Sequence, residues 1–209
     1  MKNSKLKQIG WMLLLIVSVG TLSSCSDDDD QDTNPITGQN ITEDDKEALL
    51  FMLEEEKLAR DTYFYLDSVW SINTFANIKL SEQQHMDAVE SLINSYSISY
   101  QIQPMGVFED TLLQNFYNQF ITDGVQSKVN ALTIGATIED LDIVDLREYI
   151  AHTDNQNLIA VFENLECGSR NHLRSFVKDI VKEGATYTPQ FLTQMDYDLI
   201  INSPSGPCN

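Results

Sequence analysis

The stretch Ile78–Val89, with the sequence IKLSEQQHMDAV, decides how the chain is interpreted. Ile78 and Val89 fit one apolar face of an expected helix. Steps of three and four residues through Glu82 and His85 keep all four side chains on that face. A glutamate and a histidine that point into a protein core need partners, because burial of an unpaired charge is costly. The pair therefore predicts further polar side chains that reach the same place from other parts of the chain.

Three other apolar stripes at helical spacing are interrupted in the same way. The interrupting residues are Glu56 in the stripe 49–66, Glu139 and Asp142 in 132–150, and Ser169 and His172 in 158–180. Alternation typical of strands is nearly absent. We therefore predict an all-α fold in which four long helices direct these side chains toward the axis of a bundle.

A metal ion would explain why four helices place ionisable residues on their apolar faces. One such glutamate or histidine is more often a hydrogen-bonded structural residue than a ligand. Several buried carboxylates would repel one another without a cation, and carboxylates with imidazoles suit iron, manganese or zinc. The predicted metal ligands are Glu56, Glu82, His85, Glu139, Asp142 and His172.

The connections between the helices suggest their order. Thr42, with Asp45 three residues later, is expected to cap the first helix, and Ser127 the third. About 30 residues separate the second and third long helices, which favours two helix hairpins joined by one long crossover. Short extra helices are expected from Phe108 to about Asp123, with Leu112 on the apolar face, and after Pro189.

Other polar residues near the expected core receive more ordinary interpretations. Glu55 points away from the Glu56 face and is expected in solvent, as is His152 after the third helix. Ser81 is expected as an outward or first-turn residue. Tyr63 lies two turns from Glu56 and is read as a core tyrosine, with a role as a proton or radical donor near a metal as the alternative.

Four stretches carry a family resemblance: EKLARDTY at 56–63, EQQH at 82–85, IGATIE at 134–139 and GSRNHLRSF at 168–176. They resemble the two helix pairs of rubrerythrin-type ferritin-like proteins. Together they are similar to the ferritin-like family called domain of unknown function 2202, over about residues 45–200. The resemblance implies a ferritin-like four-helix bundle and a carboxylate-bridged centre with two metal ions, usually iron.

The chain departs from the ferritin-like pattern at Ser169, where the fourth helix of the family pattern has the glutamate of Glu-x-x-His. Four carboxylates balance two divalent ions, whereas Glu56, Glu82 and Glu139 supply three. Asp142 would restore the count. Without it, the centre would hold one metal, or two metals with a bound anion or hydroxide.

The N-terminal residues predict export and lipidation. Residues 1–24 combine three lysines with an apolar run from Trp11 to Val19, and the sequence Leu22–Cys25 resembles a lipobox. Cleavage before Cys25 and lipidation of that residue would anchor the protein in the cell envelope, in the outer membrane and on its surface side. An ordinary signal peptide or an uncleaved anchor is the alternative. Residues 25–44 are acidic and are expected as a disordered tether to a domain at 45–209.

The charge of the chain excludes one class of partner. Without the three lysines of residues 1–24, 10 basic residues remain against 32 acidic ones, a net charge near −22. Binding to a nucleic acid backbone is therefore not expected. Cys167 and Cys208 could form a disulfide or remain two free thiols, and the oligomeric state stays open.

Two functions remain from the sequence. The first is a redox enzyme that reduces peroxide or O₂, or oxidises iron. It would need an external electron donor, because the chain lacks the Cys₄ site that rubrerythrins typically carry. The second is a lipoprotein without catalytic activity, which binds metal or interacts at the cell surface on the same scaffold.

Overall fold

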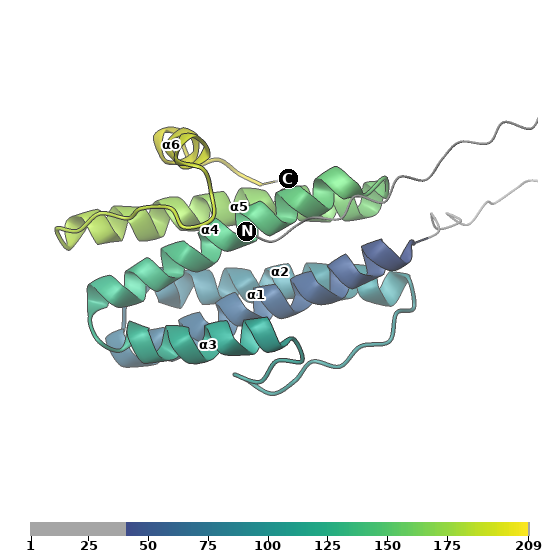
Figure 1. Cartoon of the computed structure of the whole chain (residues 1–209), viewed down its shortest axis with the longest axis horizontal. Coiled ribbons are helices and arrows are strands. Elements are labelled where there is room, and N and C mark those ends of the chain that lie inside the picture. Colours follow the sequence, from purple (N-terminus) through teal and green to yellow (C-terminus); the bar gives the residue numbers. More distant parts are fainter. Residues whose placement is uncertain (1–40, 209) are drawn as a thin grey trace, which may run out of the picture. The chain divides into compact units, whose positions relative to one another are not determined.

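The structure is a computed structural model that describes residues 41–208. These residues form six helices and no strand, which confirms the all-α prediction (Figure 1). The helices are α1 (Glu43–Trp70), α2 (Asn73–Ser95), α3 (Thr111–Gly124), α4 (Lys128–His152), α5 (Gln156–Lys182) and α6 (Gln194–Asn202).

The predicted signal peptide at 1–24, Cys25 and most of the predicted tether lie outside the described residues. Helix α1 begins at Glu43 and so includes the last two residues of the segment expected as tether. Among residues 41–208, no helix combines the length and apolar character needed to cross a membrane.

The long helices form two hairpins that face each other. Two residues join α1 to α2, and three join α4 to α5, so the members of each hairpin pack chiefly against each other. Helix α1 also packs on α4, and α2 on α5. In Figure 1 the α1–α2 hairpin and the α4–α5 hairpin form two layers, with α3 beside α1 and α6 outside α5.

The helix boundaries follow the expected capping residues. Thr42 and Asp45 form a reciprocal capping box at the start of α1, and the Ser127 hydroxyl accepts a hydrogen bond from the Asn130 N–H at the start of α4. Asn155 caps α5. The prediction for α3 was partly wrong: Leu112 is exposed, and the buried side chains are Leu113, Tyr117 and Phe120.

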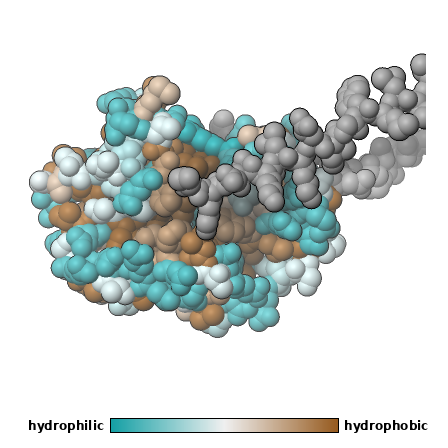
Figure 2. All heavy atoms as spheres, in the orientation of Figure 1, coloured by the Kyte–Doolittle hydropathy of each residue, from teal (hydrophilic) through white to brown (hydrophobic). Residues whose placement is uncertain are grey.

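Two hydrophobic clusters fill the interior. One cluster contains Leu58, Tyr63, Phe75, Ala136 and Phe176, and the other contains Leu53, Met86, Leu146, Phe162 and Leu165. Along each long helix, the interrupting polar residues fall where one cluster gives way to the other. The outer surface mixes polar and apolar residues, and Figure 2 shows apolar ones in the middle of one face with polar ones around them.

A buried aspartate fastens the segment between α5 and α6. Asp140 has no exposed surface and accepts hydrogen bonds from the Tyr187 hydroxyl at 2.7 Å and the Gln190 N–H at 2.6 Å. It also accepts from the N–H groups of Leu192 at 2.7 Å and Phe191 at 3.3 Å. The Tyr187 hydroxyl and the Leu192 N–H are buried, and because buried donors need a partner, Asp140 holds this loop on α4.

Asp140→Ala should lower the free energy of unfolding by about 3 kcal/mol, since several buried donors would lose their acceptor. Urea denaturation measures the loss. Asp198→Ala, at an exposed position of α6, is the control and should change stability by less than about 0.5 kcal/mol. Equal effects of the two substitutions would contradict the role of Asp140.

Candidate metal centre

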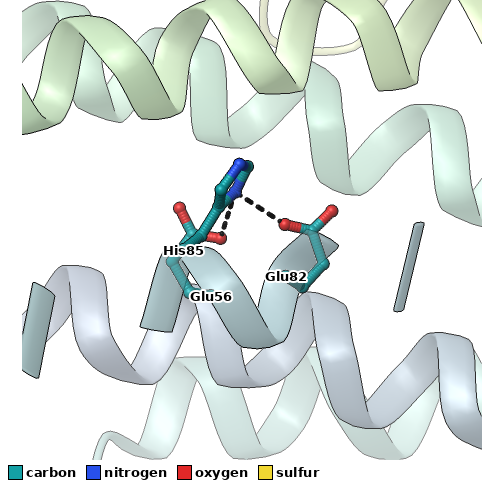
Figure 3. A group of neighbouring side chains, drawn as sticks. All are labelled: Glu56, Glu82 and His85. Carbon is teal, nitrogen blue, oxygen red and sulfur yellow. Dashed lines mark hydrogen bonds and ion pairs between the residues drawn. The ribbon is translucent and has the colours of Figure 1, made fainter. Parts of the chain in front are cut away.

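Glu82 lies at the middle of a buried group of acidic and imidazole side chains. Its Oε2 atom is 2.8 Å from Nδ1 of His85, and its Oε1 atom is 2.9 Å from Nδ1 of His172. Glu56 Oε2 is 3.2 Å from the same His85 nitrogen, and Glu139 Oε2 is 3.4 Å from the His172 nitrogen. Figure 3 shows Glu56, Glu82 and His85 converging from α1 and α2. All five residues are at most 9% exposed.

These five residues form two sets of potential ligands that share Glu82. Glu56, Glu82 and His85 form one set, and Glu82, Glu139 and His172 form the other. Within each set, one ligand atom from every residue lies within 4.8 Å of the others. The arrangement brings together five of the six residues predicted from the sequence, and it makes Glu82 the carboxylate that could bridge two ions.

Asp142, the sixth predicted residue, belongs to neither set but is buried beside them. Its Oδ2 atom accepts a hydrogen bond from the hydroxyl of Ser169. Its Oδ1 atom has no hydrogen-bond partner within the described residues. Asp142 on α4 and Ser169 on α5 are thus joined inside the bundle. We call these six residues, Glu56, Glu82, His85, Glu139, Asp142 and His172, the Glu82 site.

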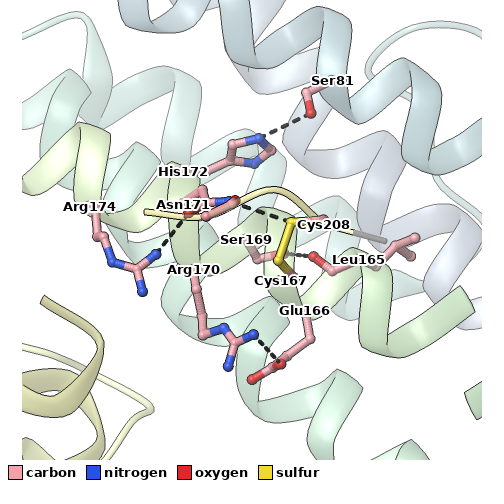
Figure 4. Close-up of a disulfide and its surroundings, with 11 residues drawn as sticks. Ser81, Leu165, Glu166, Cys167, Ser169, Arg170, Asn171, His172, Arg174 and Cys208 are labelled. Carbon is pink, nitrogen blue, oxygen red and sulfur yellow. Dashed lines mark hydrogen bonds and ion pairs between the residues drawn. A yellow bond between two sulfur atoms is a disulfide. The ribbon is translucent and has the colours of Figure 1, made fainter. Parts of the chain in front are cut away.

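Two hydroxyl groups contact the candidate ligands Glu139 and His172. The Tyr63 hydroxyl donates a hydrogen bond to Glu139 Oε1 at 2.6 Å. Ser81 Oγ lies 3.1 Å from Nε2 of His172, the ring nitrogen on the far side from Glu82 (Figure 4). The sequence interpretation of Ser81 as an outward or first-turn residue missed this contact with His172 on α5. Such contacts fix the orientation of an imidazole ligand.

The charges of the Glu82 site are strongly coupled. Burial would raise the pKa of Glu82, but the neighbouring His172 and His85 lower it well below its usual value. Burial would lower the pKa of His172, but Glu82 and Glu139 raise it to about 10. The pKa of His85 is also raised, by Glu56 and Glu82. The neighbouring carboxylates therefore favour the protonated form of both imidazoles in the absence of a cation.

The pKa values of the other three carboxylates, Glu56, Glu139 and Asp142, are raised, in contrast to that of Glu82. Burial raises the pKa of Glu56 to about 7, against the opposing charge of His85. Burial and the charge of Glu82 likewise raise the pKa of Glu139 to about 7. Burial and the charge of Glu56 raise the pKa of Asp142 well above its usual value. Divalent cations would remove these penalties by replacing protons.

Glu55 is a buried residue that the sequence interpretation placed in solvent. Its side chain is 1% exposed, and burial together with the charges of Asp142 and Asp145 raises its pKa well above the usual range. The prediction failed because α1 is covered on several faces, by α2, α3 and α4, whereas the helical pattern was read as having one buried face. The expectation for His152 was correct, since it is exposed.

A cavity of about 470 Å³ between α2 and α5 opens onto both imidazoles. We call it the histidine cavity; its lining includes Ser81, His85, Gly168, Asn171, His172 and Cys208. Gly168 is required there, because a Cβ atom at this position would lie 2.6 Å from Nε2 of His85. The sequence contained a signal for this glycine, which stands between the buried Leu165 and His172 on the apolar face of α5.

Comparisons with known proteins identify relatives without an assigned function. Residues 45–204 match the family described as "Uncharacterized protein domain (DUF2202)". The chain is 46% identical over 167 residues to uncharacterized protein MJ0754 of Methanocaldococcus jannaschii, covering 79% of this chain and 90% of that protein. It is also similar to the crystal structure of hypothetical protein MJ0754 from Methanococcus jannaschii DSM 2661. The TM-score is 0.80 at 44% identity, over 83% of this chain and 100% of that chain.

Gly168→Ala should displace the His85 imidazole, because the added methyl group would overlap Nε2. The NMR signals of His85 should shift, and metal binding by the purified protein should weaken at least tenfold. Gly206→Ala is the control, since a Cβ atom there meets no other atom within 4 Å. Unchanged His85 signals in Gly168→Ala would refute this packing.

The metal-free protein should become less stable as pH rises. Glu56, Glu139 and His172 have raised pKa values in the folded state. Their stabilising contributions are complete below the unfolded values. They disappear as pH rises through about 7 for the glutamates and about 10 for the histidine. Glu82 acts in the opposite sense, and its contribution disappears in acid.

Melting temperatures of chelator-treated protein at about pH 5, 7 and 9 test this dependence, and they should fall in that order. Metal-loaded protein should show a weaker fall or the reverse, because metal binding releases protons and strengthens with pH. A melting temperature that is constant or rises with pH in the chelator-treated protein would contradict the assigned charges.

Proposed function

The chain belongs to the DUF2202 family, and we propose that it is a lipid-anchored, ferritin-like protein whose Glu82 site binds two metal ions and carries out redox chemistry. Iron is the preferred metal, with manganese or zinc as alternatives. The proposed reaction is reduction of peroxide or O₂, or oxidation of ferrous iron. The observation that carries the proposal is the pair of ligand sets that share Glu82.

The unpaired atoms of the Glu82 site support a bound cation. Oε1 of Glu56, Oε1 of Glu82, Oδ1 of Asp142 and Nδ1 of His172 are buried without a hydrogen bond among the described residues. The close contact between Glu82 and His172 therefore lacks hydrogen-bond geometry, although it is an ion pair at 2.9 Å. Buried polar atoms without partners are rare in native proteins. Carboxylate oxygens and imidazole nitrogens are suitable ligands for iron.

Some of the described residues would bind the metal ions, and others orient these ligands. Glu56 and His85 would hold one ion, Glu139 and His172 the other, and Glu82 would bridge them. Asp142, oriented by Ser169, would supply the fourth carboxylate. Tyr63 keeps one oxygen of Glu139 in place, and Ser81 orients His172. Bound iron would supply a change between divalent and trivalent states for reaction with O₂ or peroxide.

The ferritin-like bundle is part of the proposal. Its support is the pair of helix hairpins joined by the segment 96–127, which contains α3 and makes the single long crossover. This is the connection that a bundle of two hairpins requires. The histidine cavity would admit small substrates to the imidazole side of the site.

The proposed location follows from the N-terminal residues. A lipid on Cys25 would attach the protein to the outer membrane, and the acidic run Asp27–Asp30 would keep the domain away from an anionic surface. An external electron donor would be a partner for peroxide reduction.

Metal analysis of protein purified without chelators tests the function. Two equivalents of iron, with a visible absorption band that changes on addition of peroxide, are expected. His85→Ala and His172→Ala should each reduce bound metal at least tenfold, whereas His152→Ala, at an exposed position, should retain it.

Other results would decide against the proposal. Full metal retention in both site variants would refute the ligand set. One equivalent of redox-inert zinc would favour the second function, a metal-binding or surface-interaction lipoprotein without catalysis. Absence of metal, with a melting temperature unchanged by chelator, would exclude a metal centre.

A further inference from the structure

A disulfide links α5 to the C-terminal tail beside the histidine cavity. Cys167 and Cys208 are joined, with their Cα atoms 5.7 Å apart. Cys208 lines the histidine cavity together with His85 and His172. Gly168, the residue after Cys167, packs against His85, and the Asn171 amide is 3.4 Å from the Cys208 sulfur. Figure 4 shows the disulfide beside Asn171, with His172 above it and Arg170 below it.

The other side of the disulfide faces a positively charged cavity. Cys167 lines a cavity of about 340 Å³ with Arg147, Arg170 and Arg174, three of the four arginines in the chain. Glu166 pairs with Arg147 and Arg170, and Asp196, which also lines the cavity, pairs with Arg147, so Arg174 is the arginine there without an ion pair among the described residues. Arg174 donates only to the Ile200 carbonyl and the Asn171 side chain in the contacts of residues 41–208. Positive charge near a cysteine favours the thiolate, which is the reactive form.

The disulfide fastens only a short, exposed segment at the C-terminal end of the described residues. Residues 202–207 are exposed, and the Asn171 bond to the Gly206 carbonyl is their main anchor besides the disulfide. Helix α6 is fixed independently, through buried Tyr197 and Ile200 and the bond from Arg174 to the Ile200 carbonyl. Both cysteines are half-buried and Cys208 lines an open cavity, and an accessible disulfide is more easily reduced than one sealed in a core. The position therefore suits a disulfide that opens and closes.

We propose that Cys167 and Cys208 form a redox-active pair that supplies the two electrons for peroxide reduction at the Glu82 site. The inference rests on the proposed function, for which it identifies the immediate electron source. Two thiols lose two protons and two electrons as the S–S bond forms. Hydrogen peroxide takes up two protons and two electrons as its O–O bond breaks, and gives two water molecules. Two molecules of an external thiol then restore the pair by thiol–disulfide exchange and leave as their own disulfide.

The experiment measures the oxidation of the two thiols and not the catalytic turnover of peroxide. The full-length protein, loaded with iron or depleted of it, is reduced with dithiothreitol, desalted without oxygen and mixed with one equivalent of hydrogen peroxide. Alkylation and peptide mass spectrometry then measure the oxidation of Cys167 and Cys208 separately. In the iron-loaded protein the disulfide should form at least tenfold faster than in the iron-depleted protein.

Two results would overturn the proposal. Disulfide formation at the same rate with and without iron would show that the centre takes no electrons from the pair, whether that rate is fast or equals that of free glutathione. Retention of both thiols while peroxide is consumed would show that electrons come from elsewhere. Circular dichroism of the reduced protein should be unchanged, because α6 does not depend on the disulfide.

The double variant Cys167→Ser, Cys208→Ser separates this inference from the proposed function. With its iron reduced chemically by dithionite, it should still consume peroxide once, but a thiol reductant should no longer sustain turnover. If it consumes peroxide and the thiols of the wild-type protein do not respond to iron, the inference fails and the function stands. If the dithionite-reduced variant binds iron and reacts with neither peroxide nor O₂, the proposed function fails, and this inference fails with it.

Discussion

Burial of the ionised Glu82 carboxylate between two imidazoles is the constraint on which the rest of the described structure depends. The carboxylate lies where two hydrophobic clusters meet, so water cannot compensate its charge. His85 and His172 reach it from α2 and α5, which ties the two hairpins together at mid-length. Their partners Glu56 and Glu139 come from α1 and α4. Each long helix must therefore keep its register, since a shift of one residue would leave a buried charge without a partner.

The same constraint explains the pairing of Asp142 with Ser169. A serine at position 169 is too short to reach the middle of the bundle as a ligand. Its hydroxyl donates a hydrogen bond to Asp142 on α4 instead. Asp142 then lies close enough to Glu56 and Glu139 for their charges to raise its pKa. A carboxylate that is buried and repelled in this way is stabilised either by a proton or by a cation.

Much of this arrangement could be predicted from helical spacing. A polar residue that interrupts an apolar stripe, as Glu56 does between Leu53 and Ala59, must point into the core together with its apolar neighbours. Caps such as Thr42 and Ser127 are local and were predicted correctly. The failures involve tertiary contacts that spacing does not encode. Glu55 is buried because α4 covers a second face of α1, and Ser81 matters because His172 approaches from a helix about 90 residues away.

Helix α5 shows how one short segment can carry several tasks. Within two turns, Cys167 faces the arginines, Gly168 admits the His85 ring, Ser169 holds Asp142 and His172 reaches Glu82. Because helical geometry spreads consecutive residues around the axis, neighbours in sequence reach both the buried site and the surface. A change of redox state at Cys167 is therefore one residue away, along the backbone, from the contact that positions His85. That proximity gives a physical reason for a disulfide at this end of an exposed tail, where fastening the chain would contribute little.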